Sequence, residues 1–340
     1  MTKSHAFAAL ALSLVLVGCS TVQTAPPTSA PKPTVEVTPT AAAQERETGL
    51  VAPAQVFGGS CDALFTAAEL GEAIGIPVTG PNTWQLQDGG TRYVEQHGGI
   101  RCSWSASGFA ASVSLIALPE SAVDYAEPTG CGIETEGGST GCSLEATENG
   151  VRLSGAVFRT DNDLAALGAA QTSLLDLFAQ RAQGANVAVL PLPAAGSWAW
   201  PVDCATVVAA GDFSAVPGLG GSVTGGQTGG SDAYFVAAEN ALWGGFVPPY
   251  CEVGHDQIWV YFSALGGGRW TQSEVSAFPG SSTIAVAGID SVLLSPGYGD
   301  TTRVDVYDGP NWVTFNVRYA SNAGSMAAAL VAALDTTAIE

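Results

Sequence analysis

The chain repeats one pattern at a distance of 160 positions, and this repeat constrains the fold more than any other feature. Residues 143–158 align without a gap on residues 303–318. In both segments, apolar and polar residues alternate on each side of a short turn, which is Asn149-Gly150 in the first copy and Gly309-Pro310 in the second. Alternation with a period of two across a short turn is typical of a β-hairpin. The sequence therefore predicts two halves of related structure.

Each hairpin is followed by a segment with helical periodicity. Asp163 lies where an N-cap is expected, and the second segment follows Asn322. One helical face contains Leu164, Leu167, Gln171, Leu174, Leu175 and Phe178 in the first copy, and Met326, Ala329, Leu330, Ala333 and Leu334 in the second. Both halves are therefore expected to end with a helix.

A helix is also expected at the start of each half. Thr66 and Glu69 form a capping-box pattern, and Gly75 is suited to end that helix. The segment after Cys204 is a weaker version of the same pattern and is interrupted at Gly211.

Strands flanked by helices at both ends, without regular β-α-β alternation, predict an α+β fold with mostly antiparallel sheets. We expect two tandem related domains, each with an N-terminal and a C-terminal helix. Domain one is predicted over residues 57–184, and domain two, a divergent repeat, over residues 196–340. Pro191 and Pro193 suit a short linker between them.

Six cysteines form an even set, which favours disulfides in an oxidising compartment. They are Cys61, Cys102, Cys131, Cys142, Cys204 and Cys251. Six cysteines allow 15 pairings, and the sequence alone does not choose among them. Order along the chain favours Cys61 with Cys102, Cys131 with Cys142, and Cys204 with Cys251. The first and third pairs would tie the first helix to the sheet in each half, and the second is interpreted as a staple on an inserted loop. No metal site is expected, because metal-binding cysteines usually occur as CxxC pairs or near histidine.

The N-terminal 18 residues have the three parts of a secretory signal peptide: a weakly basic start, an apolar run and a small residue before Cys19. Residues 16–19, Leu-Val-Gly-Cys, also resemble a bacterial lipobox. The resemblance implies cleavage before Cys19 and acylation of its sulfur, which would anchor the chain in the lipid bilayer, since two acyl chains suffice for stable anchoring. The alternative is an ordinary signal peptide with an incidental Cys19. Residues 19–56 are rich in Thr, Ala and Pro and are expected to form a disordered tether.

The net charge of −20 argues against nucleic acid as a partner, because an acidic chain repels phosphate backbones. The acidic residues are scattered and contain no Asp-x-Asp-x-Asp-Gly calcium loop. After the signal, no stretch is apolar over the length that a membrane helix needs. We expect a protein on the extracytoplasmic face of the membrane, held there by lipid.

The first half has a helix opened by a cysteine and a later Cys-x-Trp strand. The residues of this pattern are Cys61, Leu64, Phe65, Thr66, Glu69 and Leu70, followed by Cys102 and Trp104. In this pattern the first half resembles a family of uncharacterised lipoproteins of actinobacterial cell envelopes. In the second half, Glu252 and Val253 follow Cys251 where Ser-Trp is expected. The resemblance implies a location and a disulfide, and it assigns no catalytic residue and no cofactor.

Motifs for catalysis are weak. Residues 137–141, Gly-Gly-Ser-Thr-Gly, satisfy the G-x-S-x-G pattern but lack the strand before and the helix after that a nucleophile elbow requires. His97 and His255 lie in predicted turns and are interpreted as surface residues, and Asp256 is too close in sequence to orient His255. The glycine-rich segments contain no GK[ST] phosphate-binding signature.

Tryptophan is concentrated in the second half: Trp198, Trp200, Trp243, Trp259, Trp270 and Trp312. Trp259 and Trp312 lie in predicted strands and are interpreted as packing residues. Trp198, Trp200 and Trp243 border predicted loops and are candidates for lining a groove for sugar or peptide, although core packing is the competing interpretation.

These features favour a membrane-anchored lipoprotein that acts as a binding or sensing module in the cell envelope, with an envelope protein or glycan as its ligand. The alternative is a cell-wall-directed hydrolase that uses Asp and Glu as acid and base. Asp300, Asp305 and Asp308 are available carboxylates, but their sequence positions do not establish a catalytic pair. An enzyme is the less favoured class.

Overall fold

The computed structural model describes residues 51–81, 89–122, 130–134, 140–187, 195–199, 203–219, 224–228, 250–255, 258–297 and 299–339. All of these residues belong to one compact unit. The predicted signal peptide, Cys19 and the tether as far as residue 50 lie outside the described residues.

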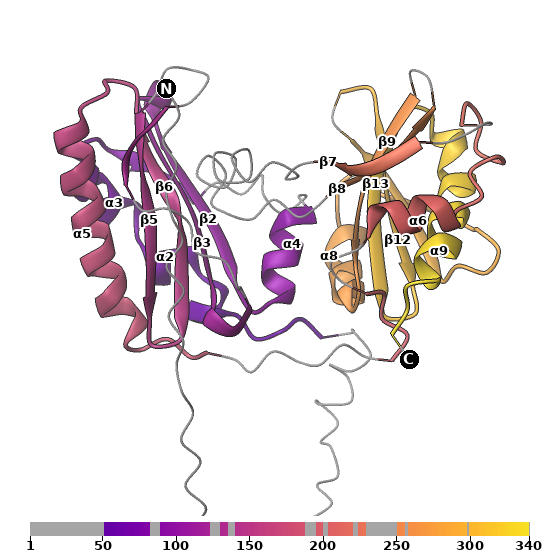
Figure 1. Cartoon of the computed structure of the whole chain (residues 1–340), viewed down its shortest axis with the longest axis horizontal. Coiled ribbons are helices and arrows are strands. Elements are labelled where there is room, and N and C mark those ends of the chain that lie inside the picture. Colours follow the sequence, from indigo (N-terminus) through magenta and orange to yellow (C-terminus); the bar gives the residue numbers. More distant parts are fainter. Residues whose placement is uncertain are drawn as a thin grey trace, which may run out of the picture. The chain divides into compact units, whose positions relative to one another are not determined.

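The described residues form two antiparallel sheets, one of six strands and one of seven (Figure 1). The first contains β1 (Val78–Thr79), β2 (Ile100–Ala106), β3 (Ala111–Pro119), β4 (Cys131–Glu134), β5 (Thr140–Glu148) and β6 (Val151–Arg159). The second contains β7 (Thr224–Thr228), β8 (Tyr250–His255), β9 (Ile258–Leu265), β10 (Ser282–Ile284), β11 (Ser291–Pro296), β12 (Thr302–Asp308) and β13 (Asn311–Val317).

The two sheets have the same topology. Strands of the first follow the order β1-β2-β3-β6-β5-β4, and strands of the second follow β7-β8-β9-β13-β12-β11, with β10 added at the edge. The repeat seen in the sequence coincides with equivalent hairpins, β5-β6 and β12-β13. The predicted α+β fold with two related sheets is confirmed.

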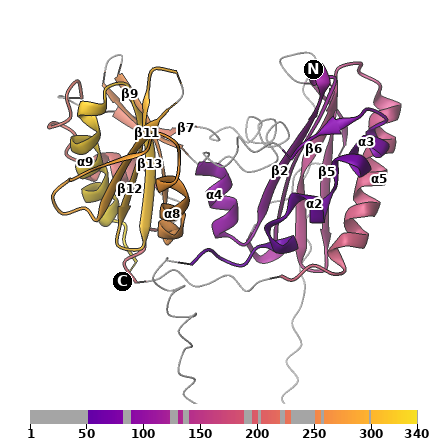
Figure 2. The ribbon, with the colours of Figure 1, turned by 180° about the vertical axis from the view of Figure 1, so that it is seen from behind.

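Helices cover one face of each sheet (Figure 2). In the first half these are α2 (Cys61–Leu64), α3 (Ala67–Ile74) and α5 (Leu164–Ala182), and in the second half α6 (Cys204–Ala210) and α9 (Ala323–Asp335). The apolar strand residues that face them form one core in each half. Two further helices, α4 (Gly89–Gln96) and α8 (Gln272–Ser276), lie outside these cores. The described chain also contains the 3-10 turns η1 (Val56–Gly59), η3 (Ser107–Phe109), η4 (Glu120–Ala122), η5 (Gly268–Thr271) and η6 (Ala320–Asn322).

Local signals in the sequence account for the ends of several elements. Thr66 and Glu69 form the predicted capping box of α3, which ends at Gly75 with a left-handed φ of 74°. Asp163 caps α5 by accepting a hydrogen bond from the backbone N–H of Ala166. At the β5-β6 turn, Asn149 and Gly150 have φ values of 49° and 75°, and the two-residue turns that match the twist of a hairpin require positive φ at both positions.

Three disulfides join the pairs favoured by chain order: Cys61–Cys102, Cys131–Cys142 and Cys204–Cys251. The first ties α2 to β2, and the third ties α6 to β8 in the equivalent position. The interpretation of Cys131 and Cys142 as a staple on a loop needs correction. They lie directly opposite each other on β4 and β5, so this bond holds an edge strand onto the first sheet.

The disulfides indicate an extracytoplasmic location, because thiols are kept reduced in most cytosols. Among the described helices, none combines the length and apolar character required to cross a bilayer.

Candidate functional site

Helix α4 contacts both sheets through neighbouring side chains. Val94 is fully buried against Ile116 and Leu118 of β3. Tyr93 is 8% exposed and packs in a cluster with Leu265 of β9 and Trp312 of β13. Adjacent residues of an α-helix point about 100° apart, which lets one short helix present a different residue to each sheet.

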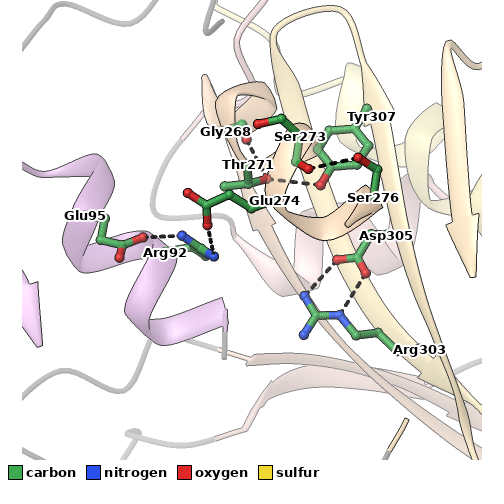
Figure 3. Close-up of polar contacts among 10 residues, drawn as sticks. All are labelled: Arg92, Glu95, Gly268, Thr271, Ser273, Glu274, Ser276, Arg303, Asp305 and Tyr307. Carbon is green, nitrogen blue, oxygen red and sulfur yellow. Dashed lines mark hydrogen bonds and ion pairs between the residues drawn. The ribbon is translucent and has the colours of Figure 1, made fainter. Parts of the chain in front are cut away.

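Arg92 of α4 binds two carboxylates (Figure 3). Its Nη1 donates to Glu95 Oε2, one helical turn further on, at 2.8 Å. Its Nη2 donates to Glu274 Oε2, on α8 of the second half, at 2.5 Å. The guanidinium carbon also lies 5.5 Å from the centre of the Trp270 ring, within the range of a cation–π contact. With only 3% of its side chain exposed, Arg92 is a buried cation that depends on these partners.

Gln96 continues the contact one turn along the same helix. Its Oε1 accepts a hydrogen bond from Trp270 Nε1 at 2.6 Å, and its Nε2 donates to the carbonyl of Gly266 at 3.4 Å. Trp270 is thereby held by Arg92 at its ring face and by Gln96 at its N–H group.

A cavity of about 720 Å³ opens beside this cluster. Its charged lining consists of Arg92, Glu95 and Glu274, next to Trp270. Its other described walls come from residues 52–55 with Gly58, which precede the first helix, and from Asn186 with Val187, which follow α5. Four segments far apart in the sequence therefore build one cavity.

The wall formed by residues 52–58 has an unusual backbone. Phe57, Gly58 and Gly59 all have positive φ, at 53°, 63° and 76°. A left-handed conformation is common for glycine but costs a residue such as phenylalanine about 1 kcal/mol or more. The N–H of Val56, which is fully buried, donates to the carbonyl of Gly98 at 2.8 Å and fixes this wall to the turn after α4.

Burial and charge shift the acid–base properties of the cluster in different directions. Burial raises the pKa of Glu95, Arg92 opposes that shift, and the neighbouring carboxylate of Glu274 adds to it. Burial alone would lower the pKa of Arg92, but Glu95 and Glu274 outweigh it and raise that pKa. One guanidinium thus faces two carboxylates, and with all three groups ionised the cluster carries one excess negative charge.

Figure 3 shows a second polar cluster, which contains Arg303, Asp305, Tyr307 and Thr271. Its β12 residues alternate with Val304 and Val306 of the core, so they lie on the face of the second sheet opposite α6 and α9. Arg303 donates to both oxygens of the fully buried Asp305 at 2.8 Å, and Trp312 Nε1 donates to its Oδ1 at 3.0 Å. Tyr307 Oη lies 3.1 Å from Thr271 Oγ1. A carboxylate with both oxygens occupied in this way is a structural group.

The three candidate aspartates do not form a catalytic pair. Asp305 is bound within the second cluster. Asp308 ends β12, and its pKa is raised by burial and by the nearby Asp335 and Asp290. Asp300 is exposed and lies before the other end of the same strand. Two glutamates that the sequence did not single out, Glu95 and Glu274, meet at Arg92 beside the cavity.

The structure places Trp198 in the core of the second half, where it is 1% exposed. Its backbone N–H donates to Asn311 Oδ1, and its indole N–H donates to Asp335 Oδ1, both at 2.9 Å. Core packing, the competing interpretation, therefore describes its position. Trp200 and Trp243, the other two groove candidates, lie outside the described residues.

His97 lies in a turn as expected, but it is only partly exposed. Its Nδ1 is 2.9 Å from the carbonyl of Tyr93, and the two rings are 4.2 Å apart. Burial lowers its pKa, and the contact with the Tyr93 carbonyl partly offsets that shift. His97 is therefore partly covered, because its ring packs against Tyr93 of α4. The side chain of His255, Asp256 and residues 137–139 of the G-x-S-x-G segment lie outside the described residues.

Sequence reasoning did not identify the cluster of Arg92, Glu95, Gln96, Trp270 and Glu274. The only local signal is the Arg-x-x-Glu spacing of Arg92 and Glu95, which suits an ion pair on a helix. Glu274 lies 182 residues beyond Arg92, so no local pattern connects them.

Fold and site together define a disulfide-bonded α+β protein in which two sheets of the same topology meet a common helix beside a charged cavity. The chain matches no protein-family model, no curated protein and no solved structure.

Proposed function

We propose that the chain is a lipid-anchored, extracytoplasmic binding module of the cell envelope, and that its ligand occupies the cavity beside α4. The observation that carries this proposal is the cavity itself, at which a buried arginine, two glutamates and a tryptophan converge. Its volume of about 720 Å³ falls within the range of ligand sites, about 300–1,000 Å³. A few polar groups beside apolar walls are also typical of such sites.

The energetics of the cluster support a ligand-binding role. Removing an ion from water costs several kcal/mol, and well-packed apolar residues often replace a buried ion pair without loss of stability. If the contact between α4 and α8 served only the stability of the fold, it would not need Arg92, Glu95 and Glu274 at the edge of a cavity. Polar groups there, with Phe57 in a costly conformation in the adjoining wall, are more readily explained by recognition.

The cavity is tested by filling it. We expect soluble glycan and peptide fragments of the cell wall to raise the melting temperature of the purified protein, because a ligand that binds only the folded state stabilises it. Val187→Trp places a large side chain at a lining residue that is 40% exposed and is expected to abolish the shift. Leu164→Trp, at an exposed residue outside the lining, is the control and should retain it. An equal shift in both variants would place the ligand elsewhere.

The anchor is a separate part of the proposal and rests on the Leu-Val-Gly-Cys sequence at residues 16–19. Mass spectrometry of the membrane-extracted protein is expected to find an acylated N-terminal Cys19. Cys19→Ala should move the protein from the membrane fraction to the soluble fraction. An unmodified chain that starts at another residue would refute the anchor and leave the cavity proposal intact.

A hydrolase is a second candidate, because Glu95 and Glu274 share one cavity and differ in environment. Burial raises the pKa of Glu95, as a general acid requires. Arg92 opposes this shift in the pKa of Glu95 and forms an ion pair with each carboxylate, so binding remains the better-supported function. Release of sugars from cell-wall glycan by the wild type, lost in both Glu95→Gln and Glu274→Gln, would favour the hydrolase.

A further inference from the structure

We infer that the cavity beside α4 binds an organic cation, namely an ammonium or guanidinium group on a short apolar stem. The inference rests on the proposed function, since it assumes that this cavity is the ligand site. It specifies the chemical class of the ligand.

The first argument is the charge of the lining. Among the described lining residues, Glu95 and Glu274 contribute two negative charges and Arg92 one positive charge. Arg92 Nη1 already donates a hydrogen bond to Glu95, and its Nη2 donates one to Glu274. An incoming phosphate or carboxylate would meet a guanidinium engaged by two carboxylates and would add to the excess negative charge. A cation would remove that excess.

The second argument is the acceptor capacity of Glu274. An ionised carboxylate has about four acceptor sites, and the described contact with Arg92 uses its Oε2. The Glu274 side chain is 52% exposed, so an entering group has access to it. Hydrogen bonds between an ionised donor and a carboxylate are about twice as strong as neutral ones. An ammonium or guanidinium group is the donor that gains most from this arrangement.

The third argument concerns the remaining walls, which suit the stem of an organic cation. Ala52, Pro53 and Val187 offer apolar surface beside the charged cluster. A bare divalent ion fits less well, because calcium takes six to eight oxygen ligands. Within the described residues, no group of three or more His, Cys, Asp or Glu side chains is arranged to hold a metal.

The net charge of the whole chain also favours a cationic ligand. A net charge of −20 attracts cations over distances longer than any single contact and raises their rate of encounter. The effect weakens as salt screens it, over about 8 Å at physiological ionic strength.

The test compares each amine with its N-acetylated form, in which the positive charge is absent. Isothermal titration calorimetry with the full chain uses the tripeptide Ala-Lys-Ala with blocked termini and the same peptide with its lysine acetylated. A second pair, glucosamine and N-acetylglucosamine, presents the amine on a sugar. We expect the amine of at least one pair to bind at least tenfold more tightly than its acetylated form. The pair that shows the difference identifies a peptide or a sugar as the source of the cation.

Variants locate the effect in the cavity. Glu274→Gln is expected to weaken binding of the amine at least tenfold, whereas Glu148→Gln, the same change at an exposed glutamate outside the lining, should leave it unchanged. Thermal unfolding of both variants confirms that they are folded, and the comparison of ligands on the wild type needs no variant.

The possible failures are distinguishable. Equal or tighter binding of the acetylated forms would overturn the cation inference while retaining the cavity as a site. If no amine binds but cell-wall fragments still produce a shift that Val187→Trp abolishes, the inference fails and the proposed function stands. If neither amines nor fragments bind, both fail.

Discussion

The position of a side chain in this protein can depend on partners that lie far away in the sequence. Trp198 lies near the start of the second half and is held by Asn311 and Asp335, more than 100 residues away. Gly266 packs so closely on it that a Cβ atom there would lie 2.2 Å from the Trp198 carbonyl oxygen. This tryptophan therefore joins the start of the second half to its sheet and its last helix.

Trp198→Ala is expected to lower the free energy of unfolding by about 3–5 kcal/mol, because it removes a fully buried aromatic side chain. Trp198→Phe should cost less, since it keeps most of the apolar volume but loses the hydrogen bond to Asp335. Chemical denaturation with urea measures both. Unchanged stability in Trp198→Ala would contradict the core position.

At the scale of single helices and strands, the capping residues of the sequence form the hydrogen bonds that their chemistry predicts. The capping box of α3 also has a tertiary contact, because Glu69 Oε1 accepts a hydrogen bond from Arg181 of α5 at 2.5 Å. The hydrogen bond from the Thr66 backbone N–H is the main cause that lowers the pKa of Glu69, and Arg181 contributes to the same shift.

The capping box predicts a pH-dependent stability. Because the folded pKa of Glu69 lies below its ordinary value of 4.5, its contribution is complete above pH 4.5 and is lost as pH falls through the folded pKa. Thr66→Ala should cost about 1 kcal/mol at pH 7. Below pH 4.5 the wild type should lose more stability than Glu69→Gln. The control Glu72→Gln, at an exposed position of the same helix, should follow the wild type.

The disulfides predict a ranked loss of stability. Cys61–Cys102 spans 41 residues and Cys131–Cys142 spans 11. In the chain-entropy model, a longer closed loop stabilises more, which corresponds to about 4 kcal/mol for the first bond and about 3 kcal/mol for the second. Replacing each pair by serine and measuring urea denaturation tests the ranking. A larger loss for Cys131–Cys142 would show that its role at the sheet edge outweighs loop entropy.

At the scale of the whole molecule, α4 is the element that gives the two sheets a shared partner. It contributes Val94 to the cluster on β3, Tyr93 to the cluster on the second sheet, and Arg92 to the ion pair with α8. Unfolding of one half should therefore destabilise the other half, because α4 packs against both sheets.

Tyr93→Ala is expected to uncouple the two halves. The wild type should unfold in one calorimetric transition, and the variant in two, because it removes a buried ring that packs against Trp312 and Leu265. Tyr319→Ala, at a tyrosine that is 60% exposed, is the control and should keep the single transition. A single transition in Tyr93→Ala would mean that the halves are coupled through other contacts.

Much of the fold was predictable because it depends on neighbours in sequence. Hairpin alternation, the Asn149-Gly150 turn, the Thr66–Glu69 capping box and the Asp163 cap are each decided within a few residues. The repeat at 160 positions extended these local signals to two related halves. The edge strand at Cys131 was missed, because a short segment shows its strand character only through its partner β5.

The amino-acid sequence by itself determined the two hairpins, the helices that open and close each half, the even set of cysteines and the likeness of the two halves, since these follow from periodicity, turn chemistry and residue count. Only the tertiary structure decided that Trp198 is buried, that α4 contacts both sheets, and that Arg92 and Glu274 meet beside a cavity. The physical reason is the distance along the chain over which each kind of interaction acts. Backbone preferences act over a few residues, whereas an ion pair across 182 positions forms only after both sheets have brought its partners within hydrogen-bonding distance.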